Sequence, residues 1–213
     1  MVTRAQDYYQ YMRLSRRCCL RSLAGLASLG IARRAEASQA RPANPLADFM
    51  VTMPTCSDLT KLTPAVPSDG TFRPQAAVRT RLAPANVTTG LISLAGIVSG
   101  LKCGPIAGAR VDFWQADAGG GLDQRERGLR GSQTTDARGR YGLTTIRPGA
   151  RPGRAPHISA RVVAPSGQTV WTELFFAGDP ANARDPRCRE ELALLLSPSP
   201  GGQQARFDFV LDA

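Results

Sequence analysis

The sequence has little of what most metal, nucleotide or membrane sites are built from. Its 213 residues include a single histidine, His157, and no Cys-x-x-Cys pair, so it offers no zinc-finger ligand set. It contains no phosphate-binding loop and no dinucleotide fingerprint. Its apolar runs are shorter than the roughly 18 residues that a membrane-spanning helix needs. These absences exclude a zinc finger, a nucleotide site built on those motifs and a helical membrane span.

The net charge of +10 is unevenly distributed. Residues 1–37 hold seven arginines and two acidic residues, and this segment accounts for half of the net charge. In residues 38–213 the basic residues are nearly all arginine and are scattered along the chain. A nucleic-acid surface usually gathers basic residues into one stripe with aromatic residues between them. We therefore predict that the protein does not bind nucleic acid.

The N-terminus has the three parts of an export signal in the expected order. A twin-arginine pair, Arg16-Arg17, precedes an apolar stretch at Leu23–Ala32 and the small residues of Ala35-Glu36-Ala37. This order predicts a twin-arginine signal peptide at 1–37 and export to the periplasm or medium of a bacterium. The alternative is a basic amphipathic helix of the mature fold. Met12 begins a conventional signal by itself, so the true start is Met1 or Met12.

Cleavage after Ala37 leaves three cysteines, Cys56, Cys103 and Cys188. An odd number in an oxidising compartment is simplest to explain by one disulfide and one remaining thiol. We favour a Cys56–Cys103 disulfide, because it ties the N-terminal arm to the first core strand.

The rest of the chain divides by composition and residue pattern into two parts. Residues 38–87 are rich in proline and read as an arm, whereas 88–213 contains short apolar or alternating runs separated by Gly and Pro turns. Such runs predict an all-β, mixed β-sandwich. One short C-terminal helix is expected at 186–196, followed by a loop at 197–204. The expected strands are 91–98, 109–115, 140–146, 157–163, 170–176 and 206–211.

Four stretches resemble the intradiol ring-cleavage dioxygenases, which are ferric enzymes that open catechols between the two hydroxyls. The stretches are Gly104–Ala118, Leu129–Tyr141, Thr144–Ile158 and Glu173–Pro180. The resemblance implies that 88–213 forms a sandwich of the immunoglobulin or transthyretin type.

Members of that family hold Fe(III) with two tyrosines and two histidines, and this sequence departs from the pattern. The resemblance places Leu122 and Arg151 at the tyrosine positions, and His157 and Ser159 at the His-x-His pair. Only His157 remains a ligand. Arg154 matches a family arginine that stabilises charge on the substrate. Glu173 stands where a glutamine lines the substrate pocket.

These replacements change the chemistry of the implied site. Ferric iron prefers anionic oxygen donors, which the two phenolates supply in the family. A guanidinium at Arg151, about 4–6 Å from a trivalent cation, repels it by several kcal/mol even at an effective dielectric of about 20. A carboxylate such as Glu173 or Asp123 can pair with Arg151 instead. The sequence therefore predicts an iron site replaced by a salt bridge, with no cofactor expected.

Three functions follow from the resemblance. The first is a non-catalytic subunit that pairs with an iron-bearing paralogue or with a second copy of itself. The second is a binding protein. As a binding protein it would hold an anionic aromatic or a sugar acid in a pocket of Trp114, Arg151, Arg154 and Glu173. The alternative is an active intradiol dioxygenase that binds Fe(III) through non-standard ligands such as His157 and Tyr141.

Overall fold

The structure is a computed structural model that describes residues 61–74, 76–122 and 128–213. The predicted signal peptide and the first part of the arm lie outside these residues. The described part contains ten strands and two short 3-10 helices, η2 and η3. The strands are β1 (Leu91–Gly100), β2 (Arg110–Gln115), β3 (Arg130–Thr134), β4 (Arg140–Ile146), β5 (His157–Val163), β6 (Thr169–Phe176), β7 (Ala193–Leu194), β8 (Ser197–Ser199), β9 (Gly202–Arg206) and β10 (Phe209–Leu211).

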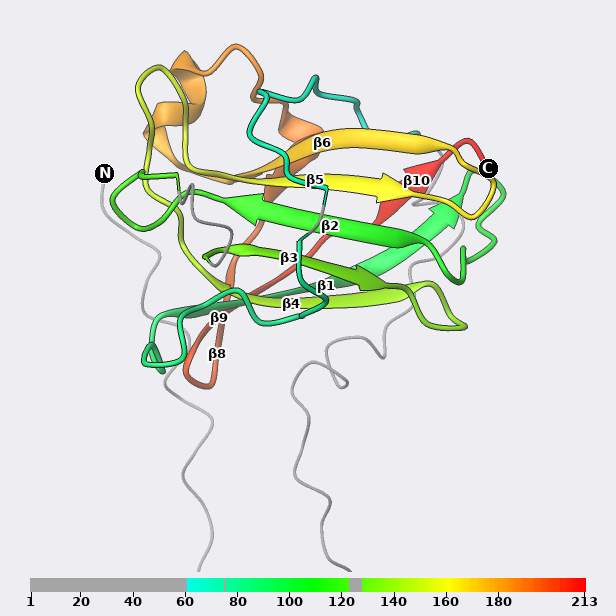
Figure 1. Cartoon of the computed structure of the whole chain (residues 1–213). Helices are drawn as coiled ribbons and strands as arrows, with labels where there is room; N and C mark the ends of the chain where they lie inside the picture. The colour runs from blue at the N-terminus through cyan, green and yellow to red at the C-terminus, as the bar shows by residue number, and fades with distance from the viewer. Residues whose placement is uncertain (1–60, 75, 123–127) are drawn as a thin grey trace, which may run out of the picture. The chain divides into compact units, whose positions relative to one another are not determined.

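These strands form two five-stranded sheets that face each other (Figure 1). One sheet has the order β3-β2-β5-β6-β7 and is antiparallel except for the β6–β7 pair. In the other, β1 pairs antiparallel with β4 and parallel with β9 and β10. The predicted all-β mixed sandwich is confirmed.

The core lies between the sheets and follows from the alternation of side chains along each strand. On β5, Ile158, Ala160 and Val162 are fully buried in the main hydrophobic cluster. Phe113 of β2 packs near Phe209 of β10, with ring centroids 6.3 Å apart. The β5 residues that alternate with these three core residues, starting with His157, therefore face the outer side of the sheet, where the candidate site lies.

The described part of the arm, 61–87, crosses this outer face, as the cyan and teal segment in front of β5, β2 and β3 in Figure 1 shows. Prolines keep it from joining either sheet as a regular strand. It is attached by backbone hydrogen bonds instead, including Val66 N to Trp171 O at 2.7 Å on β6 and Ser132 N to Ala77 O at 3.0 Å on β3. Further along, Thr144 N on β4 donates to Thr80 O at 2.8 Å.

The C-terminal third differs from the prediction in three places, one of which is the strand expected at 206–211, where β9 ends at Arg206 and β10 covers only Phe209–Leu211. The expected helix at 186–196 is replaced by a single 3-10 turn, η3 (Glu190–Leu192), followed by β7. The apolar run there pairs with β6, because Ala193 and Leu194 extend the sheet beside Phe175 and Phe176. The expected loop at 197–204 holds the hairpin of β8 and β9. The other 3-10 helix, η2 (Pro180–Arg184), is capped by Asp179, whose side chain accepts from Ala181 N.

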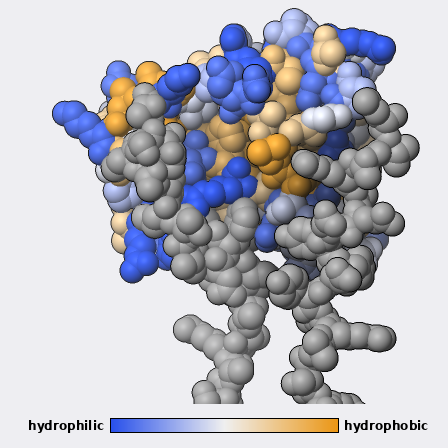
Figure 2. All heavy atoms as spheres, turned by 180° about the vertical axis from the view of Figure 1, so that it is seen from behind, coloured by the Kyte–Doolittle hydropathy of each residue, from blue (hydrophilic) through white to orange (hydrophobic). Residues whose placement is uncertain are grey.

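Within the described ranges no helix has the length and apolar character that crossing a membrane requires. On the face opposite to that of Figure 1, hydrophilic and hydrophobic residues are interspersed, with hydrophilic ones along the margins (Figure 2). The disulfide predicted for Cys103 stays a prediction, because its partner Cys56 lies outside the described residues.

Candidate functional site

Cross-strand pairing brings three of the predicted site residues into one row. Trp114 on β2 lies opposite Ser159 on β5, and Ser159 lies opposite Glu173 on β6. His157 is two residues before Ser159 and so projects from the same face of the sheet. All four are buried, with 6% or less of each exposed.

A tight turn beside this row presents the two predicted arginines. Arg151 and Arg154 form an isolated bridge, with Arg154 N donating to Arg151 O at 2.9 Å. Pro152 and Gly153 occupy the two central positions, and Gly153 has a φ of 69°. Proline followed by a residue with positive φ is the pattern of a type II turn. The turn separates the two guanidinium groups, which pair with different carboxylates.

Arg154 is the centre of a buried ion-pair network. Its Nε donates to Asp185 Oδ2 at 2.9 Å and its Nη2 donates to Glu173 Oε2. Arg187 Nη1 also reaches Glu173, at 3.3 Å from Oε1. The side chains of Glu173 and Asp185 are 4% and 0% exposed. Both carboxylates are therefore neutralised within the protein by guanidinium groups.

Arg151 pairs with the arm. Its Nη1 donates to Asp69 Oδ2 at 2.9 Å, so its partner is Asp69 and not Glu173, one of the two carboxylates considered from the sequence. The other, Asp123, lies outside the described residues. Burial alone would raise the pKa of Asp69, but hydrogen bonds from Thr71 and Arg151 hold it at about 2. The arm thus supplies the carboxylate that keeps Arg151 at the site.

The low pKa of Asp69 predicts an acid-dependent loss of stability. Because the pKa rises to about 3.9 on unfolding, ionised Asp69 contributes about 2 kcal/mol above pH 4. That contribution disappears as the pH falls from about 4 to about 2. We expect the difference in unfolding free energy between wild type and Asp69→Asn, measured in denaturant from pH 2 to 6, to shrink over this window. A constant difference would contradict the ion pair.

His157 is held in one orientation by the backbone. Its Nδ1 lies 2.7 Å from Ala155 O, and a carbonyl only accepts, so Nδ1 carries the proton of the neutral ring. Burial lowers the pKa of His157 below its ordinary value, although the contacts with Ala155 and Glu173 act in the opposite direction. The Nε2 of His157, which is unprotonated in this tautomer, lies 3.9 Å from Glu173 Oε1. Across the described ranges, Nε2 has no hydrogen-bond partner.

The arm also covers the hollow in front of this row. Trp114 Nε1 donates to Thr71 Oγ1 at 2.8 Å, and the Phe72 ring packs 5.2 Å from Trp114 and 4.9 Å from Trp171. Residues of the arm from Val66 to Asp69 line the same hollow, which is too small for a water molecule. A planar aromatic ligand therefore has no room there while the arm is in place.

The remaining predicted ligand positions do not add donors. Leu122 has a hydrocarbon side chain, and Ser159 carries a neutral hydroxyl. Tyr141, the alternative phenolate, lies in the core between Phe113 and Phe209, with its ring 5.5 and 5.3 Å from theirs. Its hydroxyl donates to Phe207 O at 2.7 Å, and burial raises its pKa well above the ordinary value. Tyr141 is a packing residue.

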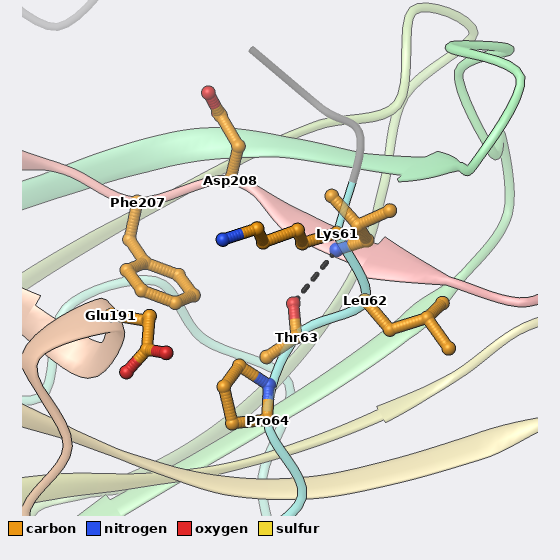
Figure 3. A pocket seen from close by; sticks show the side chains of 8 residues that line it. Lys61, Leu62, Thr63, Pro64, Glu191, Phe207 and Asp208 are labelled. Atoms are coloured by element: carbon orange, nitrogen blue, oxygen red, sulfur yellow. Dashed lines mark hydrogen bonds between the residues drawn. The ribbon is translucent and has the colours of Figure 1, made fainter.

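A larger hollow of about 310 Å³ lies elsewhere and shares no lining residue with the one in front of Trp114. Lys61, Glu191 and Asp208 line it beside the Phe207 ring (Figure 3). Its wall is held by Thr63, whose Oγ1 accepts from Val210 N at 2.8 Å. Lys61, which lines the hollow, is also the residue at which the described part of the chain begins.

Comparison with known proteins identifies the family of the chain. The model of the family described as Dioxygenase matches residues 73–213. The protocatechuate 3,4-dioxygenase beta chain of Burkholderia cepacia is 36% identical over 100 residues, covering 38% of this chain and 43% of that protein. The 6-chlorohydroxyquinol 1,2-dioxygenase of Cupriavidus pinatubonensis is 29% identical over 143 residues, covering 55% and 52%. The chain thus spans about half the length of these curated relatives.

A solved structure shares both fold and sequence with this chain. It is the dioxygenase domain of a dioxygenase–carbohydrate-binding protein fusion from Streptomyces sp. SirexAA-E, with a TM-score of 0.69 and 36% identity over 72% of this chain and 99% of that one. The family match spans two thirds of the chain, so this protein belongs to the intradiol dioxygenase family.

The family's ferric iron does not fit the residues present. Of the four positions that the resemblance assigns to ligands, only His157 keeps a ligand of the family's type, and Arg151 brings a positive charge. The nearest substitutes are Asp69 and Glu173, whose donor atoms lie within 4.8 Å of each other and of His157. Both are already bound by arginine. Among the described residues the one tyrosine is Tyr141, in the core, so this part of the chain brings no phenolate to the site as the strongly anionic oxygen donor that ferric iron prefers.

Proposed function

We propose that this protein is an exported, non-catalytic member of the intradiol dioxygenase family that acts as a subunit or binding protein. The observation that carries the proposal is the arm: it fills the hollow in front of Trp114 and Glu173, and it pairs Asp69 with the arginine at a former ligand position. Ring cleavage needs a metal and a catechol at this place. The arm and the ion pairs occupy it instead.

The subunit role is supported by a relative. The Burkholderia protein is a beta chain, which implies a sister chain. In our proposal this protein pairs with an iron-bearing paralogue or with a second copy of itself, after export by the signal at 1–37. Isolation from its native host should then yield an assembly that contains an iron-bearing chain or more than one copy of this chain. A lone monomer would count against this role.

The binding role needs the arm to move. Arg151 and Arg154 would attract the carboxylate of an anionic aromatic or a sugar acid, but carboxylates of the protein satisfy both. Such a ligand would have to displace Asp69 from Arg151. The wild type should therefore bind it more weakly than Asp69→Asn does, a difference that calorimetry with protocatechuate as the probe can measure.

The second candidate is an active dioxygenase with non-standard ligands. It is favoured by the proximity of Asp69, His157 and Glu173. The two candidates differ in colour and turnover. We expect protein from iron-replete cells to be colourless, to hold no stoichiometric iron and to consume no oxygen with catechol or protocatechuate. An active intradiol dioxygenase prepared in the same cells is the positive control. Stoichiometric iron together with oxygen uptake on catechol or protocatechuate would contradict the proposal.

A further inference from the structure

We propose that Asp69, His157 and Glu173 bind a divalent first-row cation such as Zn²⁺, which fastens the arm to the outer face of the sheet. This site differs from the ferric site of the family, because two carboxylates replace both phenolates and the second imidazole. It requires no ring-cleavage activity and therefore goes beyond the function proposed above.

The spacing of the three donors is close to what a metal requires. Their donor atoms lie within 4.8 Å of one another, and His157 Nε2 is 3.9 Å from Glu173 Oε1. Two atoms that bind a tetrahedral zinc at about 2.0–2.2 Å are about 3.3–3.6 Å apart. The histidine and glutamate atoms are within about half an ångström of this spacing. Asp69 has to approach by up to about 1.5 Å, and it lies on the arm, outside both sheets.

The orientation of His157 supplies independent support. The imidazole is 6% exposed, and its Nδ1 proton points at Ala155 O. Histidines that bind metals usually donate their other N–H to a carbonyl or carboxylate in this way. Nε2 is then unprotonated and lies 3.9 Å from the carboxylate oxygen Glu173 Oε1, and two acceptors this close together are unfavourable in a buried site. A cation between them turns this repulsion into attraction.

The surrounding arginines set the strength of the site. Glu173, Asp69 and Asp185 carry three negative charges, which Arg151, Arg154 and Arg187 balance. A cation must compete with these arginines for carboxylate oxygens.

Arg187 is the easiest to displace. Its side chain is 33% exposed, and its contact with Glu173 Oε1 is a long one of 3.3 Å. Arg154 keeps Asp185 when Glu173 turns toward a metal. We therefore infer that metal binding releases Arg187 toward solvent, and that removing Arg187 strengthens metal binding.

The single histidine makes the test direct. In a protein prepared without a histidine tag, a long-range ¹H–¹⁵N spectrum contains one imidazole, that of His157. We expect it to show the proton on Nδ1 and a free Nε2, and the Nε2 signal should shift when Zn²⁺ is added. Calorimetry should give one Zn²⁺ per chain. Zinc bound only by cysteine thiols would leave the imidazole signal unchanged and would overturn the proposal.

The direction and the size of the change in Zn²⁺ affinity in single variants identify the ligands. Asp69→Asn and His157→Gln should each weaken Zn²⁺ binding by more than about tenfold, whereas Arg187→Gln should strengthen it. Asp136→Asn, which removes an exposed carboxylate paired with Arg140, is the matched control and should bind as the wild type does. Equal affinity in the wild type, Asp69→Asn and His157→Gln would overturn the site. Oxygen uptake with catechol tests the proposed function separately, so the two failures are distinguishable.

Discussion

Replacement of Arg154 with leucine should lower the free energy of unfolding by about 3–5 kcal/mol, the cost of breaking a buried ion pair by removing one partner. The change leaves two carboxylates without their main partner, Glu173 and Asp185, whose side chains are 4% and 0% exposed. Asp185 would keep the backbone N–H groups of Ala155 and Arg187. Urea unfolding at pH 7 measures the loss.

The matched control is Arg140→Leu. Arg140 also pairs with an aspartate, Asp136, but both side chains of this pair are about 40% exposed. Ion pairs in water contribute about 0–1 kcal/mol, so this variant should change stability little. Burial alone would raise the pKa of Asp185, but backbone N–H groups and Arg154 together hold it below its ordinary value. Lowering the pH should therefore narrow the difference between wild type and Arg154→Leu, because protonated Asp185 no longer needs the guanidinium. Equal losses in the two variants would show that burial does not set the cost.

Replacement of Phe72 with alanine should destabilise the attachment of the arm, with a loss of about 2–4 kcal/mol. The ring contacts both tryptophans of the chain, and the Arg161 guanidinium lies 5.2 Å from its centre. Losing Phe72 removes these contacts and opens a path for water to Trp114. Because the protein has only two tryptophans, its fluorescence should shift to longer wavelength even before unfolding.

Val78→Ala provides the control, since Val78 lies on the same arm and is 86% exposed. Surface changes of this kind usually alter stability by less than about 0.5 kcal/mol. Limited proteolysis should cut the arm faster in Phe72→Ala than in Val78→Ala. If both variants matched the wild type in fluorescence and cleavage, the aromatic contacts would not be holding the arm.

Local sequence predicted the long strands well and the short ones poorly. The runs that became β1, β2, β4, β5 and β6 alternate or are continuously apolar, and β-branched residues mark several of them. The segment Arg-Gly-Ser-Gln-Thr of β3 carries no apolar side chain. It becomes a strand because β2 offers free backbone groups beside it. The apolar residues Ala193 and Leu194 read as helix but pair with β6, so tertiary pairing overrode local preference.

Only part of the site could be predicted from the sequence, because some of its residues lie in local motifs and others do not. Arg151, Arg154, His157 and Glu173 lie in motifs whose spacing can be read directly from the chain. Asp69, by contrast, is 82 residues from Arg151 in sequence. It sits in a Ser-Asp-Gly turn whose composition indicates only a turn. Asp185 was missed for the same reason, because it is 31 residues from Arg154 in sequence. Contacts made across the fold carry no local pattern.

The attachment of the arm also determines when the site can form during synthesis. Thr63 bonds Val210, 147 residues later in the chain, and Thr63 N donates to Val210 O as well. A ribosome makes the chain from the N-terminus, so the arm is synthesised before the strands that it contacts. It cannot bind Val210 until synthesis is nearly complete. Docking of the arm is thus a late folding event, and any metal or partner that depends on Asp69 must bind after the whole domain has been made.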